Sequence, residues 1–113
     1  MQITTAYQDL TGVDLTDANI SFGATLLDAE LRFANLSGAK LNKADLDRAD
    51  LSNSNFTGAD LTETILSDVN LIGANLSNAN LSGAVWCDNM CKCASNSFGT
   101  CVGCAPVDIC TGP

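Results

Sequence analysis

ATLLD AELRF ANLSG AKLNK ADLDR ADLSN, residues 24–53, is a run of five-residue units in which a small residue stands two places before a leucine. The same spacing continues to Trp86, which makes thirteen consecutive units in phase. A period this regular is stronger evidence for the fold than local secondary-structure propensity. The central position is apolar in every unit: Leu26, Leu31, Leu36, Leu41, Leu46, Leu51, Phe56, Leu61, Leu66, Leu71, Leu76, Leu81 and Trp86.

This period fits neither an α-helix nor a straight strand. On a helix, a step of five turns the side chain by about 140°, so the leucines would be scattered around the cylinder. On a strand, an odd step sends each leucine to the opposite face. The repeat therefore predicts a backbone that bends once in every unit and keeps the small residue and the leucine on the inner side of a polygon. Glycine, asparagine, aspartate and serine at the outward positions are typical of such corners.

Tandem Ala-(Asp/Asn)-Leu-x-x units resemble the pentapeptide-repeat proteins, and the resemblance covers roughly Gln8 to Trp86. It implies an all-β fold, a right-handed quadrilateral β-helix with four units per coil. About sixteen units would then give about four coils. Units centred on Leu10, Leu15 and Ile20 precede the main run one residue out of phase, which predicts a one-residue bulge at a corner around residues 21–23.

A coil of twenty residues aligns the outward residues in columns along the rod. Stacked asparagines can form an amide ladder. Aligned carboxylates can hold a divalent cation, present an acidic face to a partner, or form a solvated surface. Outward apolar residues can form a dimer or docking patch if they cluster. The expected sets are an amide column (Asn35, Asn55, Asn75), an acidic column (Asp9, Glu30, Asp50, Asn70), a third acidic side (Asp28, Asp45, Asp47, Asp68, with Arg48) and the outward apolar residues Leu27, Phe33, Ile65, Ile72 and Val85.

The composition divides the chain of 113 residues into a repeat region, residues 1–86, and a cysteine-rich tail, residues 87–113. The net charge of -8 argues against binding to nucleic acid or to anionic lipid. No apolar run is long enough to span a membrane. No signal peptide begins at Met1, so we expect a mature form.

All six cysteines lie in the tail, which is too small to have a core of its own. Three disulfides, in any of fifteen pairings, are the first interpretation. A zinc site built from Cys91-x-Cys93 and Cys101-x-x-Cys104, or reduced thiols, are the alternatives. A redox-active Cys101–Cys104 pair is disfavoured because no strand followed by a helix surrounds it. The candidate disulfide residues are Cys87, Cys91, Cys93, Cys101, Cys104 and Cys110.

The tail also predicts a cap and a compartment. Unpaired strand edges at the end of a β-helix invite aggregation, so we expect the tail to cover that end and Trp86 to close the last coil. Trp86-Cys87-Asp88 and Ser97-Phe98-Gly99 resemble the ends of pentapeptide-repeat proteins from cyanobacteria and the thylakoid lumen. This resemblance implies an oxidising, extracytoplasmic compartment, either periplasm or thylakoid lumen.

Nothing in the sequence predicts an enzyme. There is no histidine, no nucleophile beside a recognisable base and no phosphate-binding glycine loop. We therefore expect a non-catalytic structural or protein-interaction module without cofactor or metal, a monomer or weak dimer that docks an unidentified protein partner. One alternative is an acidic DNA mimic that resembles the fluoroquinolone-resistance pentapeptide proteins that inhibit DNA gyrase. The other is a metal-binding protein that uses the cysteine tail.

Overall fold

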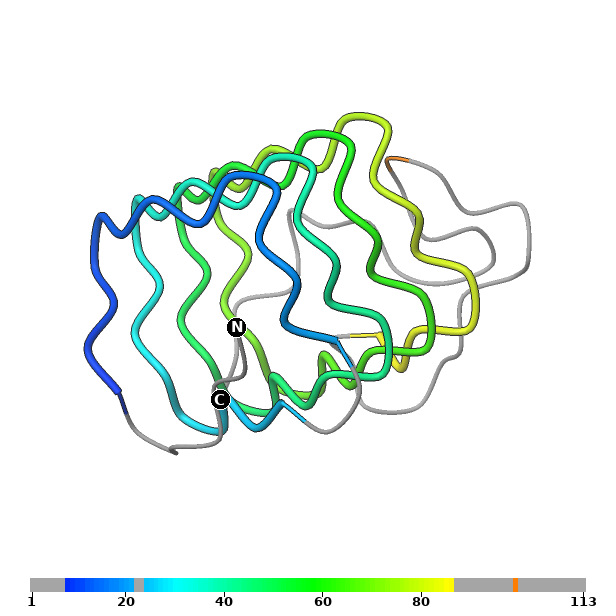
Figure 1. Ribbon diagram of the computed structural model, residues 1–113. Coiled ribbons are helices and arrows are strands. Elements are labelled where there is room, and N and C mark those ends of the chain that lie inside the picture. The colour runs from blue at the N-terminus through cyan, green and yellow to red at the C-terminus, as the bar shows by residue number, and fades with distance from the viewer. Residues whose placement is uncertain (1–7, 22–23, 87–98, 100–113) are drawn as a thin grey trace.

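The computed structural model describes residues 8–21, 24–86 and 99. Their backbone winds into four-sided coils that lie side by side along a short rod, from the blue to the yellow end of Figure 1. Within these ranges there is no helix and no run of consecutively paired strand residues. Instead, one outward residue on each side of a coil forms an isolated parallel bridge to the next coil.

These bridges define four columns, one along each side of the rod. Side 1 is Asp9, Glu30, Asp50 and Asn70; side 2 is Asp14, Asn35, Asn55 and Asn75; side 3 is Asn19, Lys40, Asp60 and Asn80; side 4 is Thr25, Asp45, Ile65 and Val85. The bridges confirm the predicted columns on sides 1 and 2 and the four units per coil. The pentapeptide-repeat proteins that such coils resemble form right-handed β-helices.

The register confirms the extra residue between the early units and the main run. Asn19 pairs with Lys40, a step of 21 residues, whereas Thr25 pairs with Asp45, a step of 20. One additional residue therefore lies between Asn19 and Thr25. Residues 22 and 23 of the predicted bulge around residues 21–23 lie outside the described ranges, so the bulge itself stays a prediction.

Each unit is fixed by hydrogen bonds to its neighbouring coils. In the unit of Leu36, the Leu36 N–H donates to the Asn55 carbonyl (2.7 Å) and the Gly38 N–H to the Thr57 carbonyl (2.9 Å). The Asn55 N–H in turn donates to the Ala34 carbonyl (2.9 Å). Backbone hydrogen bonds thus join every coil to the next, as expected of a solenoid in which each repeat contacts only its neighbours.

The corners are tight turns that begin at the central residue. The Ala39 N–H donates to the Leu36 carbonyl (3.1 Å), and the third turn residue, Gly38, has φ +67°. A positive φ at that place alone is the mark of a type II turn. The residues that adopt it are Gly12, Asp17, Asp28, Phe33, Gly38, Lys43, Arg48, Asn53, Gly58, Glu63, Asp68, Gly73, Asn78 and Gly83.

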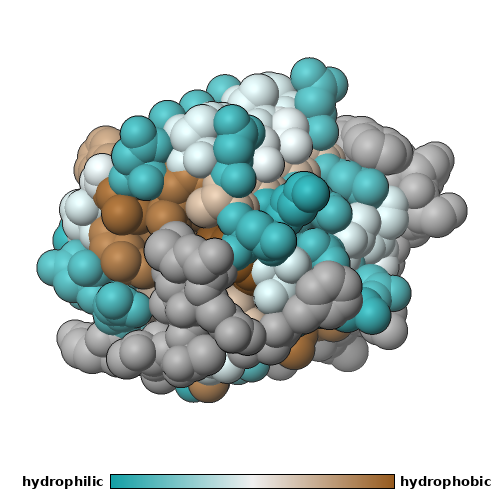
Figure 2. All heavy atoms as spheres, viewed as in Figure 1, coloured by the Kyte–Doolittle hydropathy of each residue, from teal (hydrophilic) through white to brown (hydrophobic). Residues whose placement is uncertain are grey.

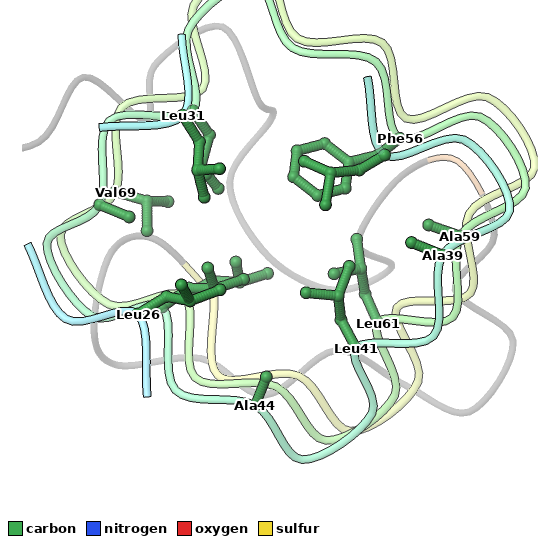
Figure 3. Close-up of a cluster of buried hydrophobic side chains, with 14 of the residues drawn as sticks. Leu26, Leu31, Ala39, Leu41, Ala44, Phe56, Ala59, Leu61 and Val69 are labelled. Atoms are coloured by element: carbon green, nitrogen blue, oxygen red, sulfur yellow. The ribbon is translucent and has the colours of Figure 1, made fainter. Parts of the chain in front are cut away.

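Aliphatic side chains fill the interior of the rod. Leu26, Leu31, Phe56 and Leu61 point inward from four different sides in Figure 3, while the small residues, such as Ala59, lie behind them near the corners. Leu36 is 0% exposed and Leu61 is 1% exposed, which confirms the predicted inward face. Ser54 and Thr64 replace alanine in two units, and their hydroxyls donate to the carbonyls of Leu51 and Leu61. These two buried hydroxyls are therefore satisfied.

Trp86 is fully buried in the last described coil, as the sequence predicted for a closing residue. Beyond it, the one described residue of the tail continues the ladder. The Gly99 N–H donates to the Ala79 carbonyl (2.8 Å), just as the Asn80 N–H donates to the Ala59 carbonyl one coil earlier (2.9 Å). The six cysteines lie outside the described residues, so the disulfides and the boundary between repeat and tail stay predictions.

Candidate functional site: the outer walls

The polar candidate groups among the described residues lie on the outside of the rod, because the interior is filled with apolar side chains. The coloured surface in Figure 2 is mostly hydrophilic or neutral, and its largest apolar area lies at the left of the view. The walls between the corners repeat from coil to coil. The site is therefore a set of surfaces that differ in charge and apolar content.

The outward aspartates and asparagines first of all stabilise their own corners. The Asn55 Oδ1 accepts hydrogen bonds from the N–H (3.0 Å) and the hydroxyl (2.6 Å) of Thr57, and Asp60 does the same for Thr62 (3.0 and 2.7 Å). This Asx turn satisfies a corner N–H that is not used in the ladder. The outward residues whose Oδ1 accepts the N–H two residues later are Asp9, Asp14, Asn19, Asn35, Asp45, Asp50, Asn55, Asp60, Asn70, Asn75 and Asn80.

Sequence reasoning missed this role. The signal was the recurrent spacing of aspartate or asparagine, any residue, then serine or threonine, in which each hydroxyl can add a second hydrogen bond to the same Oδ1. The predicted amide column of Asn35, Asn55 and Asn75 is present, but each amide oxygen bonds within its own corner. The asparagines of side 2 therefore stabilise their own corners, whether or not their amides also form a ladder along the rod.

The acidic column of side 1 is present as predicted. Arg32 lies beside it, with guanidinium nitrogens 3.8 Å from carboxylate oxygens of both Glu30 and Asp50. These side chains are about half-exposed, so the pairs are screened by solvent and contribute little to stability. The Thr11 hydroxyl and N–H hold the pKa of Asp9 below its usual value, so that this carboxylate is charged at neutral pH.

The third acidic set gathers at the corner between sides 4 and 1, hereafter the 4–1 corner. Arg48 forms a two-pronged pair with Asp28 on the previous coil, at 2.8 Å from Nε to Oδ1 and 3.1 Å from Nη2 to Oδ2. The hydrogen bonds from Arg48 lower the pKa of Asp28, and Asp28 raises that of Arg48. Asp45 and Asp68 lie on side 4 and at this corner, as predicted.

The Asp47 carboxylate, at the same corner, is less well paired than that of Asp28. Its Oδ2 accepts from Arg48 Nη1 (3.0 Å), while its Oδ1 is buried and has no hydrogen-bond partner in the described part of the chain. Burial raises the pKa of Asp47, the neighbouring aspartates add to the rise, and Arg48 opposes it. The 4–1 corner thus concentrates negative charge that one arginine only partly offsets.

The carboxylates do not come together as a metal site. Over residues 8–21, 24–86 and 99, no group of three or more His, Cys, Asp or Glu side chains is placed to hold a metal ion. In the same ranges, no helix of sufficient length and apolarity to cross a bilayer is present. Zinc binding by the tail falls outside these ranges and stays a prediction.

The walls differ in charge. Sides 1 and 4 and the corner between them carry seven carboxylates (Asp9, Asp28, Glu30, Asp45, Asp47, Asp50 and Asp68). The arginines that accompany them are Arg48 and, at the next corner, Arg32. Side 2 and the corner that follows it are uncharged from Asn35 onward. An acidic wall and a neutral wall therefore run along the same rod.

The outward apolar residues fall into two groups. Phe33 is 64% exposed, Ile72 is 51% exposed and Ile65 is 39% exposed, whereas Leu27 and Val85 are half-buried. Phe33 and Ile72 share the corner between sides 1 and 2, hereafter the 1–2 corner, and Ile65 and Val85 are bridged on side 4. The predicted outward positions are confirmed, and their clustering is limited to these pairs.

Comparison with known proteins identifies the repeat. The family described as Pentapeptide repeats matches residues 29–68 and 64–85, with eight copies. The chain is similar to HetL, a pentapeptide repeat protein involved in heterocyst differentiation regulation from Nostoc sp. strain PCC 7120 (TM-score 0.71, 36% identity, 74% of this chain). The match covers 35% of HetL, so the chain spans about a third of that protein.

Two further solved structures extend the comparison. The pentapeptide repeat protein Rfr23 from Cyanothece 51142 is 32% identical, with a TM-score of 0.70 over 73% of this chain and 69% of Rfr23. A pentapeptide repeat protein from the Arabidopsis thaliana thylakoid lumen is 21% identical, with a TM-score of 0.56 over 88% of this chain and 83% of that protein, and it supports the fold alone. No curated protein matches the chain.

Proposed function

The chain belongs to the pentapeptide-repeat family, and from this premise we propose that it is a non-catalytic module that docks a protein partner on its outer wall. The observation that carries the proposal is that the inward and outward residues of each unit have different roles. Inward residues fill the rod completely, and the outward aspartates and asparagines bond to their own corners. The part of each unit that is left to bind another molecule is therefore the outer surface, with one acidic and one neutral wall.

The same observation argues against catalysis. Catalytic groups are typically found in clefts, where burial and neighbouring charges shift their pKa values into a useful range. Here the carboxylates lie on outer walls, and the raised pKa of Asp47 comes from burial, at a corner where Arg48 opposes the rise. The local packing of the corner therefore accounts for this pKa shift without a catalytic role.

A protein partner also fits the charge pattern better than mimicry of DNA. A mimic needs a continuous acidic surface, and here Arg32, Lys43 and Arg48 each pair with a neighbouring carboxylate. Side 2 carries no charge from Asn35 onward. We therefore place DNA mimicry second, as the outcome that a gyrase supercoiling assay would detect.

We further propose that the chain works in an oxidising compartment, periplasm or thylakoid lumen. Six cysteines within the last 27 residues support this, because structural disulfides persist in such compartments and are rare in the cytosol. Intact mass spectrometry of the native protein should show the loss of six hydrogens. Six free thiols, or bound zinc, would contradict the proposal and favour the metal-binding alternative.

The docking function is tested by cross-linking the purified chain in an extract of its source cells, followed by titration calorimetry with the purified cross-linked protein. We expect one saturable binding event with that protein, and no inhibition of gyrase at micromolar concentrations. If no protein is cross-linked above the level of an unrelated acidic protein of similar size, the docking proposal is wrong. Inhibition of gyrase would replace it with the mimicry alternative.

A further inference from the structure

Phe33 has a backbone conformation that suits its side chain poorly. It is the third residue of a corner, with φ +59°. The other described residues at this place are glycine, asparagine, aspartate or an unbranched charged residue, such as Lys43 and Glu63. For an ordinary L-residue the left-handed conformation is unfavourable, and a bulky side chain there is an outlier.

The ring gains little burial in return. Phe33 is 64% exposed, and its neighbours along the corner are Gly12, which has no side chain, and the exposed Asn53. The backbone of the corner is already fixed by the bond from the Phe33 N–H to the Ser52 carbonyl (3.1 Å). A single exposed apolar residue is ordinary. One that also occupies a strained backbone position points to a function outside the fold.

A second apolar side chain lies on the same corner. Ile72 is two coils further along and 51% exposed, and Ser52 and Asn53 occupy the coil between. At about 4.8 Å per coil, the two apolar side chains are about 10 Å apart along the rod. The 1–2 corner therefore presents two apolar contacts, with Arg32 beside Phe33 and the small polar residues Ser52 and Asn53 between them.

Charge distinguishes the two flanks of this corner. On side 1 the column of Asp9, Glu30 and Asp50 carries three carboxylates, and Arg32 pairs with two of them. On side 2 the flank is uncharged from Asn35 onward. A complementary partner therefore carries positive charge on one flank. A second copy of the chain fits poorly, because two side chains per copy supply far less than the roughly 1,000 Å² that a specific interface buries.

We propose that Phe33 and Ile72 anchor a docking surface for a basic, apolar peptide segment of another protein, which lies along the 1–2 corner with its lysines or arginines over side 1. This inference rests on the proposed docking function and names its surface and the chemistry of the partner. Aromatic anchors of this kind commonly supply most of the binding energy of an interface.

The test uses a random peptide library displayed on phage and selected on the full chain. Selected peptides should combine aromatic or aliphatic residues with lysine or arginine. Loss of an anchor costs 2 kcal/mol or more, so Phe33→Ser should weaken binding of a synthetic selected peptide by about thirtyfold or more. The double change Glu30→Gln and Asp50→Asn, or added salt, should weaken it less. Ile65→Ser, which removes an exposed apolar residue from side 4, is the matched control and should leave binding unchanged.

A second measurement separates docking from a role in folding. Phe33→Asn should leave the thermal midpoint unchanged or raise it, because asparagine tolerates the left-handed conformation, while peptide binding is lost. A lowered midpoint would mean that the ring stabilises the fold, and the proposal would then fail. It would fail equally if selected peptides bound Phe33→Ser as tightly as the original chain.

Other outcomes separate this inference from the function on which it rests. Peptides that bind another wall would leave the docking function standing and overturn the assignment of the surface. No selected peptide on any wall would count against both. A concentration-dependent dimer in sedimentation, abolished by Phe33→Ser, would assign the corner to a second copy and overturn the choice of partner.

Discussion

The inward and outward positions of the same five-residue unit obey different rules. Leu26, Leu31 and Leu36 are 0% exposed and nearly interchangeable, whereas the residues that precede them are threonine, glutamate and asparagine. An inward residue must match a fixed space bounded by three other sides and two coils. An outward residue needs only an acceptor for its corner or a tolerance for positive φ. The interior therefore specifies the fold, and most of the variation between the units of this chain lies on the walls.

The largest expected effect comes from emptying an inward position. Leu46→Ala should lower the free energy of unfolding by about 2–5 kcal/mol, because it leaves a cavity that the neighbouring coils cannot fill. The measurement is urea denaturation followed by circular dichroism. Asp45→Ala, the adjacent outward change, is the control and should cost clearly less. A Leu46→Ala loss below about 1 kcal/mol would show that the interior is loosely packed.

At the corners, substitution of a single glycine tests the requirement for a left-handed residue. Gly58 has φ +69°, and an added Cβ would meet nothing within 4 Å, so Gly58→Ala tests backbone strain alone. We expect a loss of about 1 kcal/mol. Gly58→Asn should cost less, since asparagine tolerates this conformation and already occupies the equivalent place at Asn78. Equal stability of all three proteins would refute the requirement for a left-handed residue.

The Asx turns should contribute less to the free energy of unfolding than the inward residues do. Asn55→Ala removes the acceptor of two hydrogen bonds from Thr57 and should cost about 0.5–1.5 kcal/mol. Asn55→Asp keeps the acceptor oxygen and should stay close to the original protein. Thermal unfolding of the two variants side by side is sufficient. If both lose the same amount, the side-chain amide nitrogen matters more than the oxygen, and the amide ladder becomes the better explanation.

Much of this architecture could be predicted from the sequence, because the period of five carries the geometry directly. The inward residues, the four columns and the extra residue before Thr25 all follow from counting. Two features did not follow from counting: the two hydrogen bonds that Asn55 Oδ1 accepts, and the exposed Phe33 in a strained backbone conformation. Both depend on how side-chain and backbone atoms are oriented at a corner. The function is harder to predict from the sequence, because no reactive group recurs among the wall residues and the partner they contact is another molecule.

The smallest effect concerns pH and distinguishes two aspartates of the 4–1 corner. Arg48 lowers the pKa of Asp28 below its ordinary value of 3.8 through direct hydrogen bonds. A lowered pKa in the folded state stabilises the fold above the unfolded value, and this contribution is lost as pH falls through the lower, folded value. Asp28→Asn should therefore lower the thermal midpoint slightly at neutral pH, and the difference from the original protein should vanish once the pH falls below the lowered, folded-state pKa of Asp28. Asp68→Asn changes the same corner two coils later, at a carboxylate that forms no ion pair with the residues the structure describes, and should show a smaller difference at neutral pH. A midpoint difference for Asp28→Asn that persists unchanged in acid would mean that the Asp28–Arg48 pair does not contribute through its charge, and that the acidic wall is held by its backbone corners alone.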